Sequence, residues 1–349
     1  YKRPTFKAEF NDPKTELRLN TPATVTGSAQ YYFGGAVSTG KVSWQVKREA
    51  QFVGYPRYSR GGYIPPTRAE TIASGTTELD KDGLFTVEFN PAVAEAEKDQ
   101  IGTYAFTVSA DITDAGGETR TASRTFNLAS IAISAQITPA AEFAMVNEPF
   151  SINISRQDPD GNGRAGDAEW KLLRLIEPEQ VLMPADQDAA LPEPDAYQYA
   201  TPGDLLKARW DDSNNALSSE LFEVGDTVSS GKLQHNEQGI AKLSLTAKQA
   251  GHYRLQYSTT DKFGKAYSTT SDFIVASATN TPLATPTILR AKQTNVEVGD
   301  SVSLLAGSGF ADAPFVLEVY HGNELLSRTV QNDGIKTREF PVEEAYRGG

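Results

Sequence analysis

The sequence predicts an all-β protein made of antiparallel sheets that form sandwiches in a row. Three observations predict this class: apolar and polar residues alternate in many short segments, glycine-bearing turns separate these segments, and one arrangement of strands and turns occurs twice along the 349 residues. Because a domain has about 100 to 150 residues on average, this length suggests two or three modules.

Alternation with a period of two marks the predicted strands. In residues 41–47, Lys-Val-Ser-Trp-Gln-Val-Lys, every second side chain is apolar and its neighbours are polar. This pattern is typical of a strand with one buried side and one side facing water. Similar patterns predict strands at residues 84–89, 104–108, 240–245 and 315–320.

Glycine-bearing turns separate the predicted strands. They occupy residues 80–83, 236–239 and 332–334, and an apolar strand follows each of them. Glycine suits such positions because it has no Cβ and tolerates a positive φ. Short turns of this kind favour hairpins in series, and hence antiparallel sheets.

One arrangement of strand, turn and strand occurs in two distant parts of the chain. Residues 102–108 and 251–257 each begin with glycine and carry a tyrosine two positions later. An Asp-x-x-Gly turn follows each copy, and the final strands are predicted at residues 119–126 and 266–273. We therefore expect both tyrosines to be buried and each copy to close one immunoglobulin-like sandwich.

This repeat sets the predicted domain boundaries. One sandwich is expected over residues 1–128, and a second over residues 129–277 with an insertion at 177–230. A partial third module is expected over residues 283–349, after a linker at residues 277–282. Since the first residue is Tyr1 and no signal peptide or long apolar run is present, we expect any anchor or export signal to lie in other regions of a longer parent protein.

Composition excludes several classes of function. Hydrophobic residues make up 39% of the chain and charged residues 22%, as in soluble globular domains. The net charge of −12 is spread along the sequence, which disfavours nucleic-acid binding and binding to anionic membranes. The chain has no cysteine, so disulfides, thiolate metal sites and a cysteine nucleophile are excluded.

No pattern of catalytic residues accompanies the strands. The three histidines, His235, His252 and His321, do not have the H-E-x-x-H spacing of a zinc site, and no G-x-S-x-G nucleophile motif is present. We therefore predict that the chain is not an enzyme.

The sharpest local motif is residues 158–169, which match the calcium-loop pattern D-x-[DN]-x-[DN]-G-x₅-E in full. The predicted Ca²⁺ ligands are the side chains of Asp158, Asp160, Asn162 and Glu169, and the backbone carbonyl of Arg164. The flanking residues read as strands, however, whereas an EF-hand has helices. A turn rich in Asp, Asn and Gly is the alternative interpretation, because these residues favour turns without any metal.

A long segment at residues 52–71 is rich in tyrosine, arginine, glycine and proline. Exposed tyrosine and arginine dominate the binding energy of many interfaces, so this segment is a candidate partner-contact loop. Its candidate contact residues are Tyr55, Arg57, Tyr58 and Tyr63. The alternative is a long hairpin that folds over its own module.

Residues 1–10, 27–37, 41–44 and 72–126 are four segments that resemble the alpha-2-macroglobulin family, and its bacterial branch in particular. Residues 1–10 are similar to the start of an interior macroglobulin-like domain, and residues 27–37 followed by 41–44 look like its strand, aromatic-Gly-x-x-Val bend and next strand. Residues 72–126 are also similar to the bacterial branch. The resemblance implies tandem macroglobulin-like, fibronectin-III-like β-sandwiches that build the body of a protease trap.

We therefore expect a scaffold segment of a bacterial protease inhibitor of this family. The implied partners are the other domains of the parent protein, and proteases through the parent, in the periplasm or at the cell envelope. Without cysteine, this chain cannot carry the Cys-Gln thioester found in some members. The alternatives are a surface adhesin or stalk made of tandem immunoglobulin-like modules, and the accessory modules of a carbohydrate-active enzyme.

Overall fold

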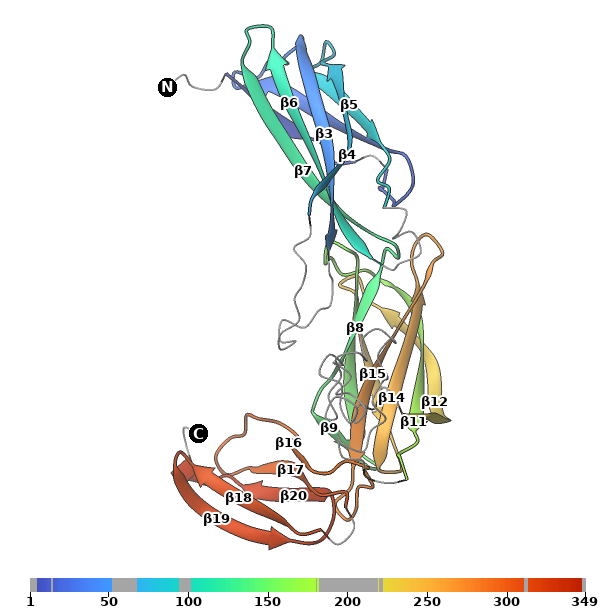
Figure 1. Cartoon of the computed structure of the whole chain (residues 1–349), viewed down its shortest axis with the longest axis vertical. Helices are drawn as coiled ribbons and strands as arrows, with labels where there is room; N and C mark the ends of the chain where they lie inside the picture. The colour runs from blue at the N-terminus through green and yellow to red at the C-terminus, as the bar shows by residue number, and fades with distance from the viewer. Residues whose placement is uncertain are drawn as a thin grey trace, which may run out of the picture. The chain divides into compact units, whose positions relative to one another are not determined.

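A computed structural model describes residues 5–13, 15–51, 68–93, 102–179, 181, 219, 222–310 and 313–346. These residues form strands β1 to β20 and one short 3-10 helix, η5 (Glu344–Tyr346), so the predicted all-β class is confirmed (Figure 1). The chain separates into two compact units. Unit 1 comprises Tyr1–Ser134 with the loops Gln157–Gly163 and Thr260–Tyr267, and unit 2 comprises the remaining residues.

Unit 1 contains two antiparallel sheets formed by seven described strands. Its strands are β1 (Phe6–Phe10), β2 (Ala23–Tyr31), β3 (Gly40–Gln51), β4 (Glu70–Glu78), β5 (Leu84–Phe89), β6 (Thr103–Asp114) and β7 (Thr119–Ala129). One sheet has the order β1-β2-β5 and the other the order β4-β3-β6-β7. The strands predicted at residues 41–47, 84–89 and 104–108 lie within β3, β5 and β6.

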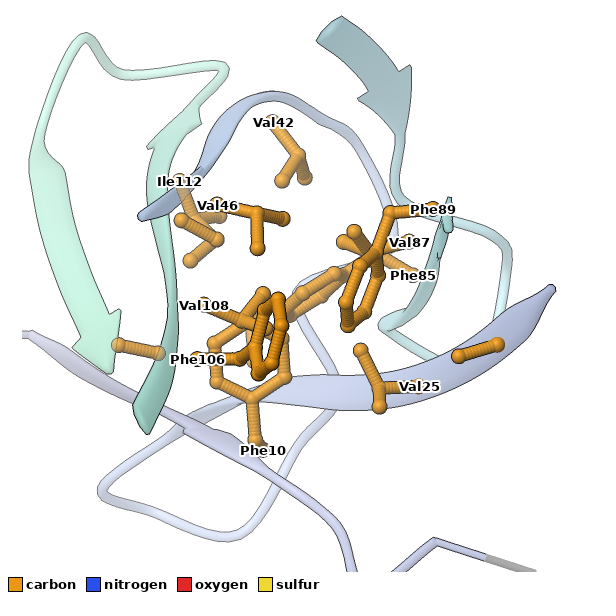
Figure 2. Packing of buried hydrophobic residues seen from close by; sticks show 14 of the residues in the cluster. Phe10, Val25, Val42, Val46, Phe85, Val87, Phe89, Phe106, Val108 and Ile112 are labelled. Carbon is orange, nitrogen blue, oxygen red and sulfur yellow. The ribbon is translucent and has the colours of Figure 1, made fainter. Parts of the chain in front are cut away.

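The core of unit 1 lies between these two sheets, and alternation explains which residues enter it (Figure 2). Along β3, Val42 and Val46 are fully buried, while the lysines at positions 41 and 47 face solvent. Facing side chains come from every second position of the other strands. They include Val25, Phe85, Val87, Phe106, Val108 and Ile112, each at most 2% exposed.

Five turns of the form Asx-x-x-Gly share one hydrogen-bond pattern. They start at Asp80, Asp114, Asp158, Asn236 and Asp261. In each turn the backbone carbonyl of the first residue accepts the N–H of the glycine, and the backbone N–H of the first residue donates to the carbonyl of the fifth residue. Its side-chain oxygen also accepts the N–H of the fifth residue. The five glycines have φ between 72° and 84°, as expected for a type I turn followed by a bulge.

The next eight described strands form a second pair of sheets. They are β8 (Ser134–Pro139), β9 (Phe143–Met145), β10 (Pro149–Gln157), β11 (Gly166–Leu175), β12 (Val224–His235), β13 (Ile240–Thr246), β14 (Gly251–Thr260) and β15 (Ala266–Ala276). The sheet orders are β13-β10-β8 and β12-β11-β14-β15-β9, and β15 pairs with β9 in the parallel direction. Tyr253 on β14 and its counterpart Tyr104 on β6 are at most 3% exposed, so the predicted burial of both tyrosines is confirmed.

Strand β12 corrects the predicted extent of the insertion at residues 177–230. β12 begins at Val224 and pairs with β11 from Leu175↔Val224 to Gly166↔His235. Its alternation is weak because many of its side chains are exposed, so pairing with β11, rather than hydrophobic pattern, defines it. Most of the remaining insertion lies outside the described residues.

A third pair of sheets repeats the order of the first five strands. It contains β16 (Ile288–Ala291), β17 (Ser301–Gly307), β18 (Phe315–His321), β19 (Glu324–Gln331) and β20 (Lys336–Pro341). The order β16-β17-β20 corresponds to β1-β2-β5, and the pair β18-β19 corresponds to β3-β4. The third pair thus matches the first five strands of unit 1, without described counterparts of β6 and β7, while the domain boundaries at residues 128 and 277 remain predictions.

Candidate functional site

Unit 2 contains the second and third sheet pairs along the chain. Side chains from both pairs form a shared apolar cluster, which we call the junction core. Its buried members are Phe143, Ile274, Ala276, Leu283, Leu305 and Ile335, and each is at most 4% exposed. They come from β9, β15, β17, the segment between β15 and β16, and the segment before β20. Since these residues are far apart in sequence, burial of this cluster holds the two sheet pairs together.

Backbone hydrogen bonds reinforce the junction core. The N–H of Thr281 donates to the carbonyl of Ile335 at 2.7 Å, and the N–H of Thr337 donates to the carbonyl of Ser277 at 3.0 Å. The hydroxyl of Thr281 also accepts the N–H of Ser277 at 2.9 Å. The predicted linker at residues 277–282 is therefore tied on both sides, and does not act as a flexible tether.

Glu177 links the second sheet pair to the segment that leads into the third. Its Oε1 accepts the backbone N–H of His252 at 3.1 Å and contacts His252 Nδ1 at 2.6 Å, and its Oε2 accepts the N–H of Ala284 at 3.1 Å. The Glu177 and His252 side chains are only 18% and 16% exposed. A carboxylate with three partners in this setting fixes the local geometry more firmly than a surface ion pair would.

A second partly buried ion pair lies between β14 and β15. Arg254 donates from Nε and Nη2 to the two carboxylate oxygens of Asp272, at 2.7 and 2.8 Å. Burial of Asp272 opposes its ionisation, but the hydrogen bonds from Arg254 and Ser219 outweigh this effect and hold the pKa of Asp272 below its usual value. The two-point contact links the side chains of the two neighbouring strands.

His235 is a buried histidine at the end of β12. It is 2% exposed, its Nδ1 lies 3.1 Å from the carbonyl oxygen of Gly166, and its ring meets the edge of Tyr257 at 5.7 Å. Because a carbonyl only accepts, Nδ1 carries the proton. Nε2 is buried without a hydrogen-bond partner among the described residues. Burial, together with the charge of Arg156, lowers the pKa of His235 below 6.5, although the hydrogen bond to Gly166 opposes this shift.

We expect unit 2 to lose stability as the pH falls below about 6.5. Since the pKa of His235 is lower in the folded protein, the unfolded chain takes up the proton first, and protonation favours unfolding until the folded-state pKa is passed. One such proton changes the free energy of unfolding by at most about 1.4 kcal/mol per pH unit. Denaturant unfolding between about pH 7.5 and 5 measures the slope.

His235→Asn is the control for this pH dependence. Asparagine keeps an N–H donor that can reach the carbonyl of Gly166, but it does not titrate. The variant is expected to be less stable at neutral pH and to show a flatter slope between about pH 6.5 and 5. Equal slopes in the two proteins would contradict the assignment to His235.

The predicted calcium ligands make hydrogen bonds within the described residues, and the Ca²⁺ site stays a prediction. Oδ1 of Asp158 accepts the backbone N–H groups of Asp160 and Asn162, and Oδ1 of Asp160 accepts from the Asn127 side chain. The carbonyl of Arg164, the predicted backbone ligand, accepts a hydrogen bond from the Arg156 guanidinium at 3.1 Å. A carbonyl that faces a buried cation is a poor ligand for a second cation.

The fifth predicted ligand lies on a strand, and the flanking elements differ from those of an EF-hand. Glu169 is exposed on β11, and Lys232 on the neighbouring strand β12 lies 3.9 Å from its carboxylate. The motif connects strands β10 and β11 instead of helices. Across the described residues, no group of three or more His, Cys, Asp or Glu side chains is arranged to hold a metal ion. The described geometry is that of the Asx-x-x-Gly turn, the alternative interpretation.

The predicted partner-contact residues Tyr55, Arg57, Tyr58 and Tyr63 lie outside the described residues, so their contact role stays a prediction. A different aromatic loop is exposed on unit 1, between β2 and β3. Tyr32 and Phe33 are 65% and 83% exposed, and Phe33 stacks on Tyr31 at 5.0 Å. Gly34 has a φ of 101°, which glycine tolerates because it has no Cβ, but local sequence could not show that its aromatic neighbours face solvent.

The three histidines lie in three different settings. His252 is engaged by Glu177, His235 is buried, and His321 lies at the end of β18, so the three histidines do not share a site. In the part of the chain that the structure describes, no helix has the length and hydrophobicity needed to cross a membrane.

Comparisons with known proteins find similarity only among solved structures. Neither a family model nor a curated protein matches the sequence. Similar structures include native Escherichia coli alpha-2-macroglobulin, at 12% identity with a TM-score of 0.34, and Salmonella alpha-2-macroglobulin reacted with methylamine, at 13% identity with a TM-score of 0.34. Each match covers 99% of this chain and 21% of that chain, so this chain spans about a fifth of the length of those proteins.

Proposed function

We propose that this chain is a scaffold segment of a bacterial alpha-2-macroglobulin-like protease inhibitor that traps proteases. In this role the chain performs no chemistry of its own and supplies rigid β-sandwiches that hold other parts of the inhibitor around a captured protease. Its partners are the other domains of the parent protein, and proteases through that parent. The proposed compartment is the periplasm or the cell envelope.

The junction core carries the structural side of this proposal. Six buried apolar side chains and two backbone hydrogen bonds join successive sheet pairs of unit 2, so these sheet pairs resist independent movement. A scaffold that must transmit a rearrangement needs such joints, because a flexible linker would absorb the movement. The resemblance of residues 1–10, 27–37, 41–44 and 72–126 to macroglobulin-like domains supports the choice of family.

The exposed aromatic loop of unit 1 supplies a contact surface for this role. Tyr32 and Phe33 lie in the aromatic-Gly-x-x-Val bend that carries part of the resemblance, and large exposed aromatic side chains are frequent anchors of protein interfaces. We place a contact with another domain of the parent at these two residues.

A surface adhesin or stalk is the second candidate. Tandem sandwiches with rigid joints also suit a stalk, and loop-bound Ca²⁺ would stiffen one further. The described hydrogen bonds of Asp158, Asn162 and Arg164 are those of a turn and give this candidate no added support.

Limited proteolysis of the full-length parent protein tests the proposal. A trap is expected to suffer one early cut and then to become markedly more compact, as small-angle scattering would record, while retaining the protease. The same protease with its active site blocked is the control, and should cause no compaction. Progressive cutting without compaction or retention of protease would contradict the inhibitor and favour the stalk.

A further inference from the structure

Unit 2 contains an open polar cavity next to the junction core. Its volume is about 530 Å³, and residues that argue for its chemistry are Arg174, Lys248, Gln249, Ser277 and Asn280. Arg174 lies near the end of β11, Lys248 and Gln249 lie in the turn between β13 and β14, and the other two follow β15. Three separate parts of the chain therefore supply the polar groups.

The charge of the cavity is opposite to that of the whole chain. The net charge of the sequence is −12, yet the charged residues that line the cavity are two cations, Arg174 and Lys248. Among the described residues neither of them forms an ion pair with an acidic side chain. A cationic cavity on an acidic protein concentrates small anions locally.

Several of the side chains that line the cavity carry hydrogen-bond donors. Nη1 of Arg174 donates to Oε1 of Gln249, so the group that Gln249 can still offer to a ligand is its NH₂ donor. Lys248 adds an ammonium group, and Asn280 adds a side-chain amide. This combination of a guanidinium, an ammonium and amide donors suits an oxyanion.

The walls of the cavity are fixed by hydrogen bonds. The N–H of Val146 donates to the carbonyl of Ala276 at 3.0 Å, and the hydroxyl of Tyr253 donates to the carbonyl of Gln249 at 2.8 Å. Ser277 is held by its bond to Thr337 across the junction. These bonds fix the backbone that carries the lining side chains, which reduces the entropy lost by the backbone on binding.

The carboxylate of Glu177 lies on the same side of Gly251 as the guanidinium of Arg174. A Cβ placed on Gly251 would lie 3.9 Å from Oε1 of Glu177 and 4.0 Å from Nη2 of Arg174, so both groups approach that point. Glu177 does not line the cavity, and its oxygens already accept from His252 and Ala284. Its carboxylate therefore weakens the positive potential without filling the site.

We infer that this cavity is an anion-binding site that takes a phosphate or carboxylate group. Arg174 supplies the planar fork that recognises two oxygens of such a group, and Lys248 supplies the second charge. Gln249 positions Arg174 through their shared hydrogen bond. The site does not depend on the proposed inhibitor function, since it rests on residues of unit 2 alone.

Titration of the full chain with inorganic phosphate and with succinate tests this inference. Calorimetry and thermal melting are carried out at constant ionic strength, with potassium chloride as the salt control. Both oxyanions are expected to bind and to raise the melting temperature of unit 2, and chloride is not. Binding by phosphate alone would assign the site to phosphate, and binding by succinate alone to carboxylates.

Three variants separate a specific site from general charge effects. Arg174→Gln is expected to weaken binding by about tenfold or more, and Lys248→Gln by several-fold. Lys242→Gln removes the same charge from an exposed position on β13 outside the cavity, and should leave binding unchanged. The melting temperature of each variant without ligand shows whether it folds.

Two results would overturn the inference. The first is an absence of heat and of melting shift with both oxyanions at about 10 mM, a concentration that would reveal even a millimolar site. The second is equal binding by the wild type, Lys248→Gln and Lys242→Gln, which would mean that the anions bind elsewhere. Because Lys248 is exposed, its variant should fold even if Arg174→Gln does not.

Discussion

Phe143→Ala is expected to lower the free energy of unfolding of unit 2 by about 3–5 kcal/mol. The Phe143 side chain is 1% exposed and packs in the junction core with Leu305 and Ile335. Its removal loses the transfer free energy of the ring and leaves a cavity between two sheet pairs that backbone hydrogen bonds keep in place. Denaturant unfolding of wild type and variant measures the difference.

The same variant also tests whether the junction core couples the two sheet pairs. Hydrogen exchange is expected to accelerate in β15 and in β17 together, because both strands contribute side chains to the cluster. Leu289→Ala is the matched control: Leu289 lies on β16 and is 66% exposed, so the expected change is within about 0.5 kcal/mol. A loss below about 1 kcal/mol for Phe143→Ala would mean that the cluster is not a core.

Gly307→Ala is expected to destabilise unit 2 by about 3 kcal/mol or more. Gly307 ends β17 with a φ of 152°, and a Cβ there would lie 2.2 Å from the carbonyl oxygen of Gly334 and 2.7 Å from Cα of Ile335. Both atoms belong to the backbone, so a side-chain rotation cannot relieve the clash. The backbone beside the junction core would have to move, and thermal or denaturant unfolding would record the loss.

Gly322→Ala separates the clash at Gly307 from the cost of a positive φ. Gly322 lies in the turn between β18 and β19 with a φ of 59°, and a Cβ there meets no atom within 4 Å. This control should therefore cost only about 1 kcal/mol of conformational strain. Similar losses for the two variants would indicate that the close approach to Gly334 is not what matters at Gly307.

The strands with strong alternation could be predicted from the sequence because the signal is local. Burial of Val42 and Val46 follows from their spacing on β3, and burial of Tyr104 and Tyr253 follows from their equivalent places in the repeat. The weakly alternating strand β12 could not be predicted in this way. Pairing with β11 defines it, and that pairing joins residues separated by most of the insertion.

The candidate sites also combine features that a local sequence pattern suggests with features that depend on the folded chain. The spacing of oxygens in residues 158–169 was local and suggested calcium, but a spacing does not state what each oxygen accepts. Only the folded chain brings the Arg156 guanidinium to the carbonyl of Arg164. The burial of His235 is likewise a property of packed strands that no local pattern records. The same holds for the position of Arg174 and Lys248 beside one cavity.

By itself, the sequence determined the all-β class, the positions of the strongly alternating strands and the turns, because side-chain alternation and the conformational freedom of glycine act within a few residues. Tertiary structure alone decided the junction core and the polar cavity beside it. Phe143, Leu305 and Ile335 lie far apart along the chain, and their contact depends on how complete sheets pack.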